Sequence, residues 1–189
     1  MAYALFETRA GLILKGIFMK TKDQEVKRGD TLSLGTREVS VDALIQKHPF
    51  SADLSPHQQR ILSDCAVLDH SYTGEIILQQ GDPANRFYLI QQGRVGVEVW
   101  RRERGATVLQ TLGPGEVLGW SWLFPPYYWQ FTARALENTE ALLLMAAPLR
   151  AECETDSRFG YELMKRLSAV MMKRLQATRC KLLGAPADL

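Results

Sequence analysis

An aromatic segment without charge has the clearest chemical character in this sequence. Residues 120–131 contain seven aromatic side chains, including three of the four tryptophans in the chain. No charged residue occurs between Glu116 and Arg134. Aromatic rings bury large areas in a core, or they stack against flat and apolar ligands. Both interpretations stay open here. Packing is preferred, and in the alternative Tyr127 and Tyr128 would offer hydrogen bonds at the mouth of a ligand site.

The cysteines do not form a metal-binding pattern. Cys65, Cys153 and Cys180 are widely separated, and no CxxC spacing occurs. Zinc sites and iron–sulfur clusters need about four clustered ligands, so neither is expected. Three scattered thiols suit a reducing cytoplasm, which is the predicted location.

The histidines do not favour catalysis. His48, His57 and His70 precede or open the β-rich region, and none lies in a GxHxH-like run. A cupin-type enzyme needs two or three histidines and a carboxylate at one metal. No nucleophile–base pair is evident among the motifs either. We therefore predict that the protein is not an enzyme and has no metal site.

Composition indicates a folded protein without a strong electrostatic preference. The 189 residues are 46% hydrophobic and 23% charged, with a net charge of +2. This charge is too small to predict binding to nucleic acid or to an anionic membrane. The longest apolar run, residues 141–149, is about half of what a bilayer requires. A lysine interrupts the apolar part of "AGLILKGIFMK", so no signal peptide is predicted, and Met19 is a candidate start.

The elements that must position the aromatic segment follow a simple order. Residues 1–40 are assigned to an N-terminal extension, and residues 41–189 to one domain. Within it we predict helices over 41–66, strands over 67–147 and helices over 148–184. Ser55 and Pro56 are suited to begin the second helix. Short β-rich runs separated by glycine, proline or asparagine predict an antiparallel sandwich or barrel, with a hairpin turn at Gly93.

The last helix is predicted over residues 158–183, ending at Gly184. A heptad seam follows one side of it at steps of three and four: Tyr161, Met164, Ser168, Met171, Leu175, Thr178 and Leu182. Leu163, Leu167 and Val170 form a second apolar edge. One face can cover the strands while the seam meets a second copy. A single wide stripe against the strands, with no dimer, is the alternative.

The β-rich region resembles a known family. "ILQQGDPANRFYLIQQGRVGVEV", residues 77–99, resembles the core signature of cyclic-nucleotide-binding domains in the catabolite-activator (Crp/Fnr-like) superfamily, and "LGPGEVLG" resembles its next motif. These positions match the first signature: Gly81, Asp82, Tyr88, Leu89, Gly93 and Val95. "LMKRLSAVMMKRLQATRCK" resembles the family's dimerisation helix. The resemblance spans about residues 49–183. It implies a mostly β fold, an eight-stranded β-roll (a double-stranded β-helix or jelly roll), with a long C-terminal helix that pairs two subunits.

The resemblance also places a phosphate-binding cassette on the aromatic segment: Gly119, Trp120, Ser121, Trp122, Leu123, Trp129, Gln130, Phe131 and Thr132. The family has a glutamate for the ribose where Trp120 stands, and an arginine for the phosphate where Trp129 or Gln130 stands. Arg134 is the nearest arginine, and strand alternation leaves its direction open.

The cassette is therefore degenerate. Loss of one partner of a buried charged pair costs ~2–5 kcal/mol. That corresponds to roughly thirtyfold to several-thousandfold in affinity. Binding of cyclic AMP or cyclic GMP is expected to be weakened or lost. The family's base-contacting Thr-Ser pair aligns with Thr178 and Arg179, so the threonine is kept and the serine is not.

These features predict a cytoplasmic regulatory sensor module for signal transduction, a homodimer that acts through a protein partner, with altered or lost nucleotide affinity. The alternative is a ligand-free dimerisation or scaffold module whose pocket is filled by aromatic side chains. About six residues follow the last helix. A helix-turn-helix needs roughly twenty or more, so direct DNA binding is not expected.

Overall fold

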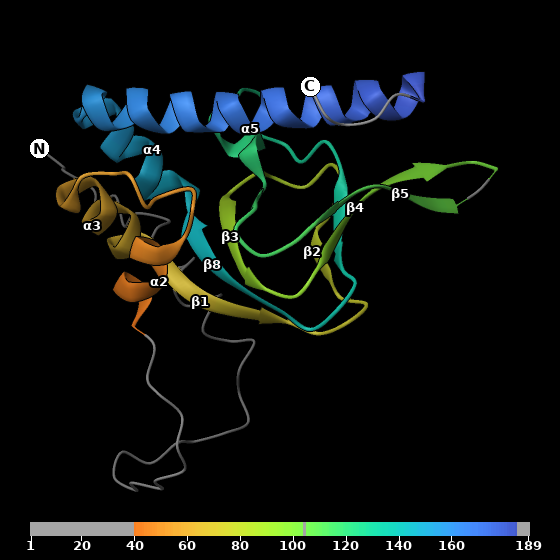
Figure 1. Cartoon of the computed structure of the whole chain (residues 1–189), viewed down its shortest axis with the longest axis horizontal. Helices are drawn as coiled ribbons and strands as arrows, with labels where there is room; N and C mark the ends of the chain where they lie inside the picture. Colours follow the sequence, from red (N-terminus) through yellow and green to blue (C-terminus); the bar gives the residue numbers. More distant parts are fainter. Residues whose placement is uncertain (1–39, 104, 185–189) are drawn as a thin grey trace, which may run out of the picture. The chain divides into compact units, whose positions relative to one another are not determined.

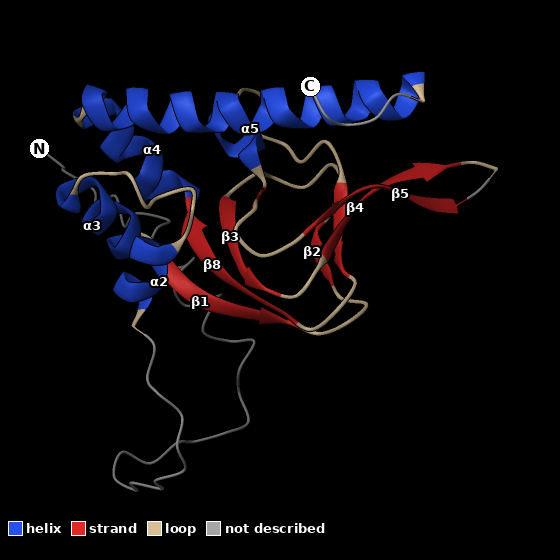
Figure 2. Cartoon of the chain, in the orientation of Figure 1, coloured by secondary structure: helices blue, strands red, loops and turns tan. Residues whose placement is uncertain are grey.

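The computed structural model describes residues 40–103 and 105–184. The predicted N-terminal extension lies outside this part, apart from Ser40. Helices α2 (Val41–Lys47) and α3 (Pro56–Asp64) precede the strands, and α4 (Ala146–Thr155) and α5 (Ser157–Leu183) follow them. Figure 1 shows the four helices gathered around one end and one side of the strands, with α5 running across them, and Figure 2 shows this division by secondary structure.

The strands form two antiparallel four-stranded sheets, so the β-roll is not a closed barrel. The first sheet has the order β1 (Ala66–Ser71), β8 (Thr139–Met145), β3 (Arg86–Gln92) and β6 (Val117–Leu118). The second has the order β2 (Ile76–Leu78), β7 (Thr132–Ala135), β4 (Val95–Arg101) and β5 (Gly105–Leu112). The predicted mostly β fold with flanking helices is confirmed.

The prediction of a hairpin at Gly93 is wrong in its pairing. A tight turn is present, since Gly93 has φ 86°, but the strands on either side belong to different sheets. Both edges of β3 are already occupied, by β8 and β6, so β4 cannot pair with it. The β4 strand pairs instead with β5, and this pair is the true hairpin of the segment.

Local sequence signals explain the helix boundaries. The hydroxyl of Ser55 accepts from the Gln58 N–H at 3.3 Å, and the Gln58 side chain accepts from the Ser55 N–H at 3.1 Å. This reciprocal capping box begins α3 at Pro56, as the sequence predicts. Gly184 ends α5 in the left-handed region at φ 63°, which a glycine adopts without steric cost.

Helix α5 presents two distinct faces. Phe159, Leu163 and Leu167 are completely buried, and Val170 packs against the same core. The seam is far more exposed, with Tyr161 at 68%, Leu175 at 56% and Leu182 at 81%. The two predicted stripes are therefore separate surfaces, one covered by the β-roll and one not covered by any described residue. No helix in the described part of the chain is long and apolar enough to cross a membrane.

Candidate ligand site

The cassette begins where β6 ends. Gly119 has φ 88° and leads directly into a short 3-10 helix, Trp120–Leu123. A Cβ atom at Gly119 would lie 3.0 Å from the Trp129 ring and 3.4 Å from the Arg86 carbonyl. The positive φ and the close ring both require glycine here. The chain therefore turns tightly enough for Trp129 to fold back over the start of the short helix.

Trp122 belongs to the hydrophobic core. Its side chain is completely buried, and its ring centre lies 6.0 Å from that of Phe87. Its carbonyl accepts from the Arg150 guanidinium at 2.7 Å, which ties the short helix to α4. Leu123 also packs against the core, whereas Ser121 is half-buried and lines the cassette cavity.

The cassette cavity is very small. Its volume is about 40 Å³. Trp120, Trp129, Gly119 and Phe131 are among its walls, with Leu78, Val97 and Ala133 closing it from the strands. This volume is far below the roughly 300–1,000 Å³ of a typical small-molecule site.

The two candidates for the arginine position differ in direction. Trp129 is 5% exposed, and its backbone N–H donates to the Asp82 carbonyl at 2.9 Å. Gln130 is exposed, and its amide donates to the nearby Tyr128 carbonyl at 3.2 Å. Both line the small cavity, but Trp129 is the buried one of the pair. A side chain at 129 would therefore face the cavity, whereas one at 130 would lie at its solvent-exposed edge.

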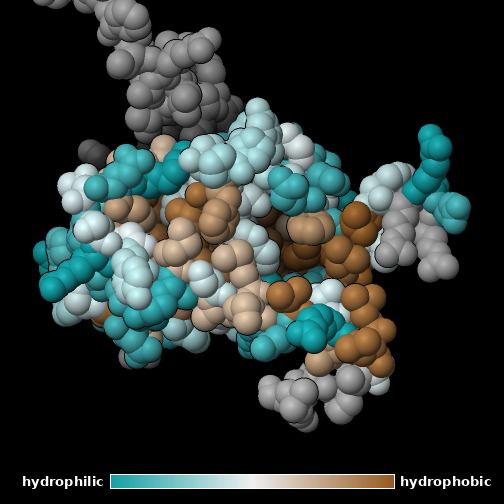
Figure 3. Space-filling view, turned by 90° about the horizontal axis from the view of Figure 1, so that it is seen from above, coloured by the Kyte–Doolittle hydropathy of each residue, from teal (hydrophilic) through white to brown (hydrophobic). Residues whose placement is uncertain are grey.

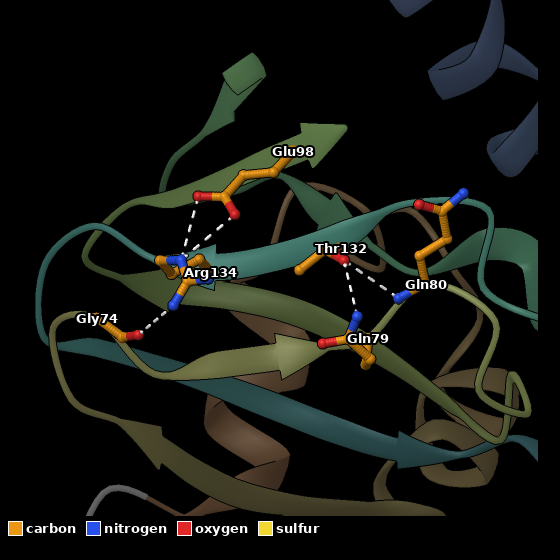
Figure 4. Close-up of polar contacts among 6 residues, drawn as sticks. All are labelled: Gly74, Gln79, Gln80, Glu98, Thr132 and Arg134. Carbon is orange, nitrogen blue, oxygen red and sulfur yellow. Dashed lines mark hydrogen bonds and ion pairs between the residues drawn. The ribbon is translucent and has the colours of Figure 1, made fainter. Parts of the chain in front are cut away.

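The nearest arginine in sequence points away from the cavity. Ala133 and Ala135 of β7 are buried, while Thr132 and Arg134 alternate with them on the outer side. Figure 4 shows Arg134 held by Glu98, and the guanidinium Nε lies 3.2 and 3.3 Å from the two carboxylate oxygens. Arg134 also donates to the Gly74 carbonyl at 2.8 Å. It is therefore engaged in holding two strands and a turn together.

Thr132 is also engaged on the outer side. Its hydroxyl oxygen accepts from the Gln80 N–H at 3.2 Å and from the Gln79 amide at 3.4 Å (Figure 4). Of the nine predicted cassette residues, Thr132 alone is absent from both the core and the cavity walls among the described contacts.

A cation from α5 that was not among the predicted site residues approaches the cassette. Arg174 is 8% exposed and lies 4.5 Å above the Trp120 ring. Its guanidinium donates to the Val117 carbonyl, and its Nε has no partner among the described atoms. Burial lowers the pKa of Arg174 to about 10, and the negative charge of Glu116 acts in the opposite direction by raising it. It is therefore protonated at neutral pH.

The sequence did contain a signal for Arg174. The buried stripe of α5 runs through Leu163, Leu167 and Val170, and the next helical step of four reaches Arg174. An arginine that continues an apolar stripe either extends past the core or pairs within it. Because the predicted stripe ended at Val170, this residue was missed.

Thr178 and Arg179 do not line the cassette cavity. Both are exposed, and the Thr178 hydroxyl donates to the Arg174 carbonyl one turn earlier at 2.9 Å. Thr178 lies on the wall of a neighbouring groove, whereas Arg179 is absent from the walls of all three described cavities. The structure thus brings Thr178, but not Arg179, to the same groove wall as Trp120, and neither residue shares a described cavity with Trp129.

That groove is the largest of the described cavities, with a volume of about 760 Å³. It lies between α5, the β4–β5 hairpin and the cassette. Its walls are Val97, Leu109, Gln110, Trp120, Phe131, Ser168, Met171, Met172, Arg174, Leu175, Thr178, Lys181 and Leu182. In Figure 3, which looks down on α5, hydrophobic residues (brown) gather around a hollow toward the end of the helix that carries the C-terminus. A smaller cleft of about 290 Å³ lies on the other flank of α5.

No cluster of three metal-ligating side chains occurs within residues 40–103 and 105–184. The three cysteines are all free, and burial raises the pKa of Cys153 to about 11. Reactive cysteines usually have a lowered pKa. These observations give no positive support for catalysis in the described part of the chain.

Comparison with known proteins identifies relatives of the β-roll. Residues 69–156 match the family whose description is cyclic nucleotide-binding domain. Similar solved structures include a Geobacter metallireducens protein assigned to the cyclic nucleotide-binding proteins, with 24% identity and a TM-score of 0.65 over 72% of this chain and 98% of that one. A cyclic nucleotide-binding domain from Methylobacillus flagellatus has 19% identity and a TM-score of 0.65, and the match covers 77% of this chain and 82% of that one. The catabolite activator protein of Thermus thermophilus has 25% identity and a TM-score of 0.58, and the match covers 71% of this chain and 61% of that one. No curated protein matches the sequence.

Proposed function

Residues 69–156 match the cyclic nucleotide-binding domain family, and on this basis we propose that the chain is a homodimeric regulatory module whose cassette no longer takes a cyclic nucleotide and which acts on a protein partner. The observation that carries this proposal is the small cassette cavity of about 40 Å³, walled by Trp120 and Trp129. A cyclic phosphate needs a paired cation and oriented N–H donors in that space. Two indole rings supply no cation, and they occupy the space.

The charges around the cassette support the same conclusion. Arg134 is held by Glu98 on the outer face of β7, and Arg174 donates to a backbone carbonyl and stacks on Trp120. Arg134 is absent from the walls of the cassette cavity, and Arg174, which is one of its walls, is already engaged in these two contacts. A nucleotide would have to displace both rings and would still lack the ribose-binding glutamate.

The exposed seam of α5 supports the homodimer. Leu175 and Leu182 are 56% and 81% exposed, and Met164 and Tyr161 extend the same stripe toward the start of the helix. Large exposed apolar side chains that recur along one side of a helix are typical of an interface. The three free cysteines suit a reducing compartment, and we place the module in the cytoplasm. We assign it no catalytic role.

A second candidate is a ligand-free dimerisation scaffold. It is supported by the same filled cavity, since a cassette that packs itself needs no effector. The two candidates differ in one measurable property, because a sensor changes its dimer or partner affinity when an effector binds, and a scaffold does not.

Two measurements on the full chain test the proposal. Titration calorimetry with cyclic AMP and with cyclic GMP is expected to give no saturable heat at micromolar concentrations. Sedimentation equilibrium is expected to show a dimer. Tight nucleotide binding, or a monomer at every concentration, would refute it.

The chain provides a matched control for the dimer. Leu182 and Leu183 are adjacent and similarly exposed, at 81% and 75%, but only Leu182 lies on the seam. Leu182→Glu is expected to shift the chain to monomer, and Leu183→Glu is expected to leave the dimer intact. Equal effects from the two substitutions would place the interface elsewhere.

A further inference from the structure

Arg174 is a buried cation with few partners. The guanidinium has five N–H donors, and the described residues give it one hydrogen-bond acceptor, the Val117 carbonyl. No carboxylate of the described residues lies within ion-pair distance of it. Glu116 is the nearest charge acting on it, but its carboxylate accepts the Gly113 N–H at 2.9 Å. A buried charge without a counter-ion is costly, so this site favours an anion.

The guanidinium borders the large groove. It stacks on Trp120, and Trp120 lines the groove of about 760 Å³ but not the smaller cleft on the other flank of α5. Arg174 and Lys181 are the two charged side chains in the groove wall, and both are positive. The wall of the smaller cleft contains three cations, Arg166, Lys173 and Arg174, but it also contains Glu116. An anion in the groove therefore meets no carboxylate in the wall.

The remainder of the groove is mostly apolar. Its apolar walls include Leu109, Phe131, Met171, Leu175 and Leu182, and its uncharged polar residues are Gln110, Ser168 and Thr178. Its volume lies within the roughly 300–1,000 Å³ of small-molecule sites, which typically combine apolar walls with a few placed polar groups. The walls offer few hydrogen-bonding groups for a sugar or a base.

We propose that this groove binds an apolar monocarboxylate, an acyl or arylalkyl carboxylic acid whose carboxylate pairs with Arg174 and whose hydrocarbon body lies between Leu109 and the α5 seam. The inference rests on the proposed function, in which the cassette is closed to cyclic nucleotides, and it supplies the effector class of that module. Ser168, Met171, Leu175, Thr178 and Leu182 belong both to the groove wall and to the seam. Occupancy of the groove therefore changes the surface that a second copy meets.

The test compares each acid with its alcohol. Octanoate, decanoate and phenylbutyrate are titrated calorimetrically into the full chain, beside octanol, decanol and phenylbutanol. The alcohols keep the hydrocarbon body and lose the charge. Each acid that fits is expected to bind saturably and about tenfold to a hundredfold more tightly than its alcohol, the range of a hydrogen-bonded charged contact.

Variants isolate the cation. Arg174→Gln is expected to lower acid affinity to the level of the alcohol while alcohol affinity stays unchanged. Arg179→Gln is the matched control, since Arg179 is exposed on the same helix and lines no described cavity, and it is expected to change neither. If Arg174→Gln does not fold, Leu109→Glu places a negative charge on the opposite wall, where Leu109 is 40% exposed. That variant is expected to reject the acid and keep the alcohol.

Several results would overturn the inference. These are no saturable binding by any of the three acids, equal affinity for acid and alcohol, or full acid binding in Arg174→Gln. Loss of acid binding as the protein concentration rises into the dimer range would assign the groove to a second copy instead. Failure of the acids leaves the homodimer and the closed cassette standing, because sedimentation and cyclic AMP titration measure those separately. Cyclic AMP binding would reject the proposed function whatever the acids do.

Discussion

The Arg174 guanidinium lies 4.5 Å from the centre of the Trp120 ring, so a cation of the C-terminal helix stacks on an indole at the first changed position of the cassette. Cation–π contacts of this kind are worth about 0.5–2 kcal/mol, depending on desolvation. Arg174 is 8% exposed. The contact therefore joins α5 to the predicted cassette without any carboxylate.

Introducing the family's glutamate at position 120 and its arginine at position 129 is expected to produce nucleotide binding. In Trp120→Glu/Trp129→Arg, both rings that wall the cavity of about 40 Å³ are removed, and the two charges of the family's cassette are supplied. We expect saturable cyclic AMP binding by calorimetry, whereas the unaltered chain is expected to bind none. This variant removes the two indole rings that occupy the site, and it also supplies a cation for the phosphate.

The register control is Trp120→Glu/Gln130→Arg. Gln130 is exposed, and Trp129, 5% exposed, would remain in the cavity. This variant is expected to bind no cyclic AMP while it folds as judged by circular dichroism. Binding by the Gln130 variant alone would show that the arginine position is 130.

The Glu98–Arg134 pair is expected to stabilise the second sheet. Glu98 is 6% exposed, and Arg134 is its ion-pair partner at 3.2 Å. Arg134→Met leaves a buried carboxylate unpaired. Because the Arg134 side chain is 34% exposed, water screens part of the interaction, and we expect a loss of about 2–3 kcal/mol in the free energy of unfolding. Urea denaturation measures it.

An exposed ion pair is the control for this prediction. Arg94 and Glu137 lie 3.5 Å apart, with side chains 60% and 53% exposed. Arg94→Met is expected to cost less than about 1 kcal/mol. In addition, Glu98→Gln/Arg134→Met is expected to be more stable than Arg134→Met, since the buried charge is gone. A double variant as unstable as the single one would contradict the pairing.

Alanine substitutions at two glycines with the same φ distinguish the stability cost of backbone strain from the cost of crowding a neighbouring side chain. Gly81 and Gly119 both have φ 88°, but a Cβ at Gly81 meets nothing within 4 Å, whereas one at Gly119 meets the Trp129 ring at 3.0 Å. Gly81→Ala is expected to cost about 1–2 kcal/mol through φ alone. Gly119→Ala is expected to cost about 1–3 kcal/mol more, because the ring must move. Thermal and urea unfolding report the difference, and equal losses would show that Trp129 yields freely.

His48 is expected to make stability depend on pH. The side chain is 2% exposed, and its Nδ1 accepts from the Phe50 N–H at 3.2 Å. Burial lowers the pKa of His48 below its ordinary value of 6.5. At a pH below 6.5 the unfolded chain then binds a proton more readily than the folded one. This contribution to stability is therefore complete above pH 6.5. As the pH falls from 6.5 toward the lowered pKa, it is lost at a rate of at most about 1.4 kcal/mol for each pH unit.

The check is urea denaturation at pH 7.5 and pH 5.5. His48→Asn is the comparison, since its side-chain oxygen can accept the Phe50 N–H without titrating in this range. The difference in unfolding free energy between the two pH values is expected to be smaller in His48→Asn than in the unaltered chain. Equal differences would show that another group controls the pH dependence.

Local features were readable from the sequence. The capping serine at Ser55, the helix end at Gly184 and the two stripes of α5 depend on residues within a turn or two of one another, and the structure has each of them where the pattern predicts. The resemblance to the cyclic-nucleotide-binding family matched Gly81 and Gly93 to its first signature, and both do have positive φ.

Features that depend on distant segments were not readable in this way. The turn at Gly93 predicted a hairpin, yet β3 was already paired on both edges by β8 and β6, which lie far along the chain. Strand alternation allowed Arg134 either direction, and the buried Glu98 of a neighbouring strand holds it on the outer face. The pairing of β3 and the direction of Arg134 both depend on residues that lie far away in the sequence.

The sequence by itself determined the fold class, because turn glycines, helix caps and apolar periodicity act over a few residues. The tertiary structure alone decided that Trp129 turns inward, that Arg174 of α5 stacks on Trp120, and that about 40 Å³ remains between the rings beside a groove of about 760 Å³. Volume and burial are set by side chains that approach from separate elements, so they exist only once the sheets and α5 have packed together.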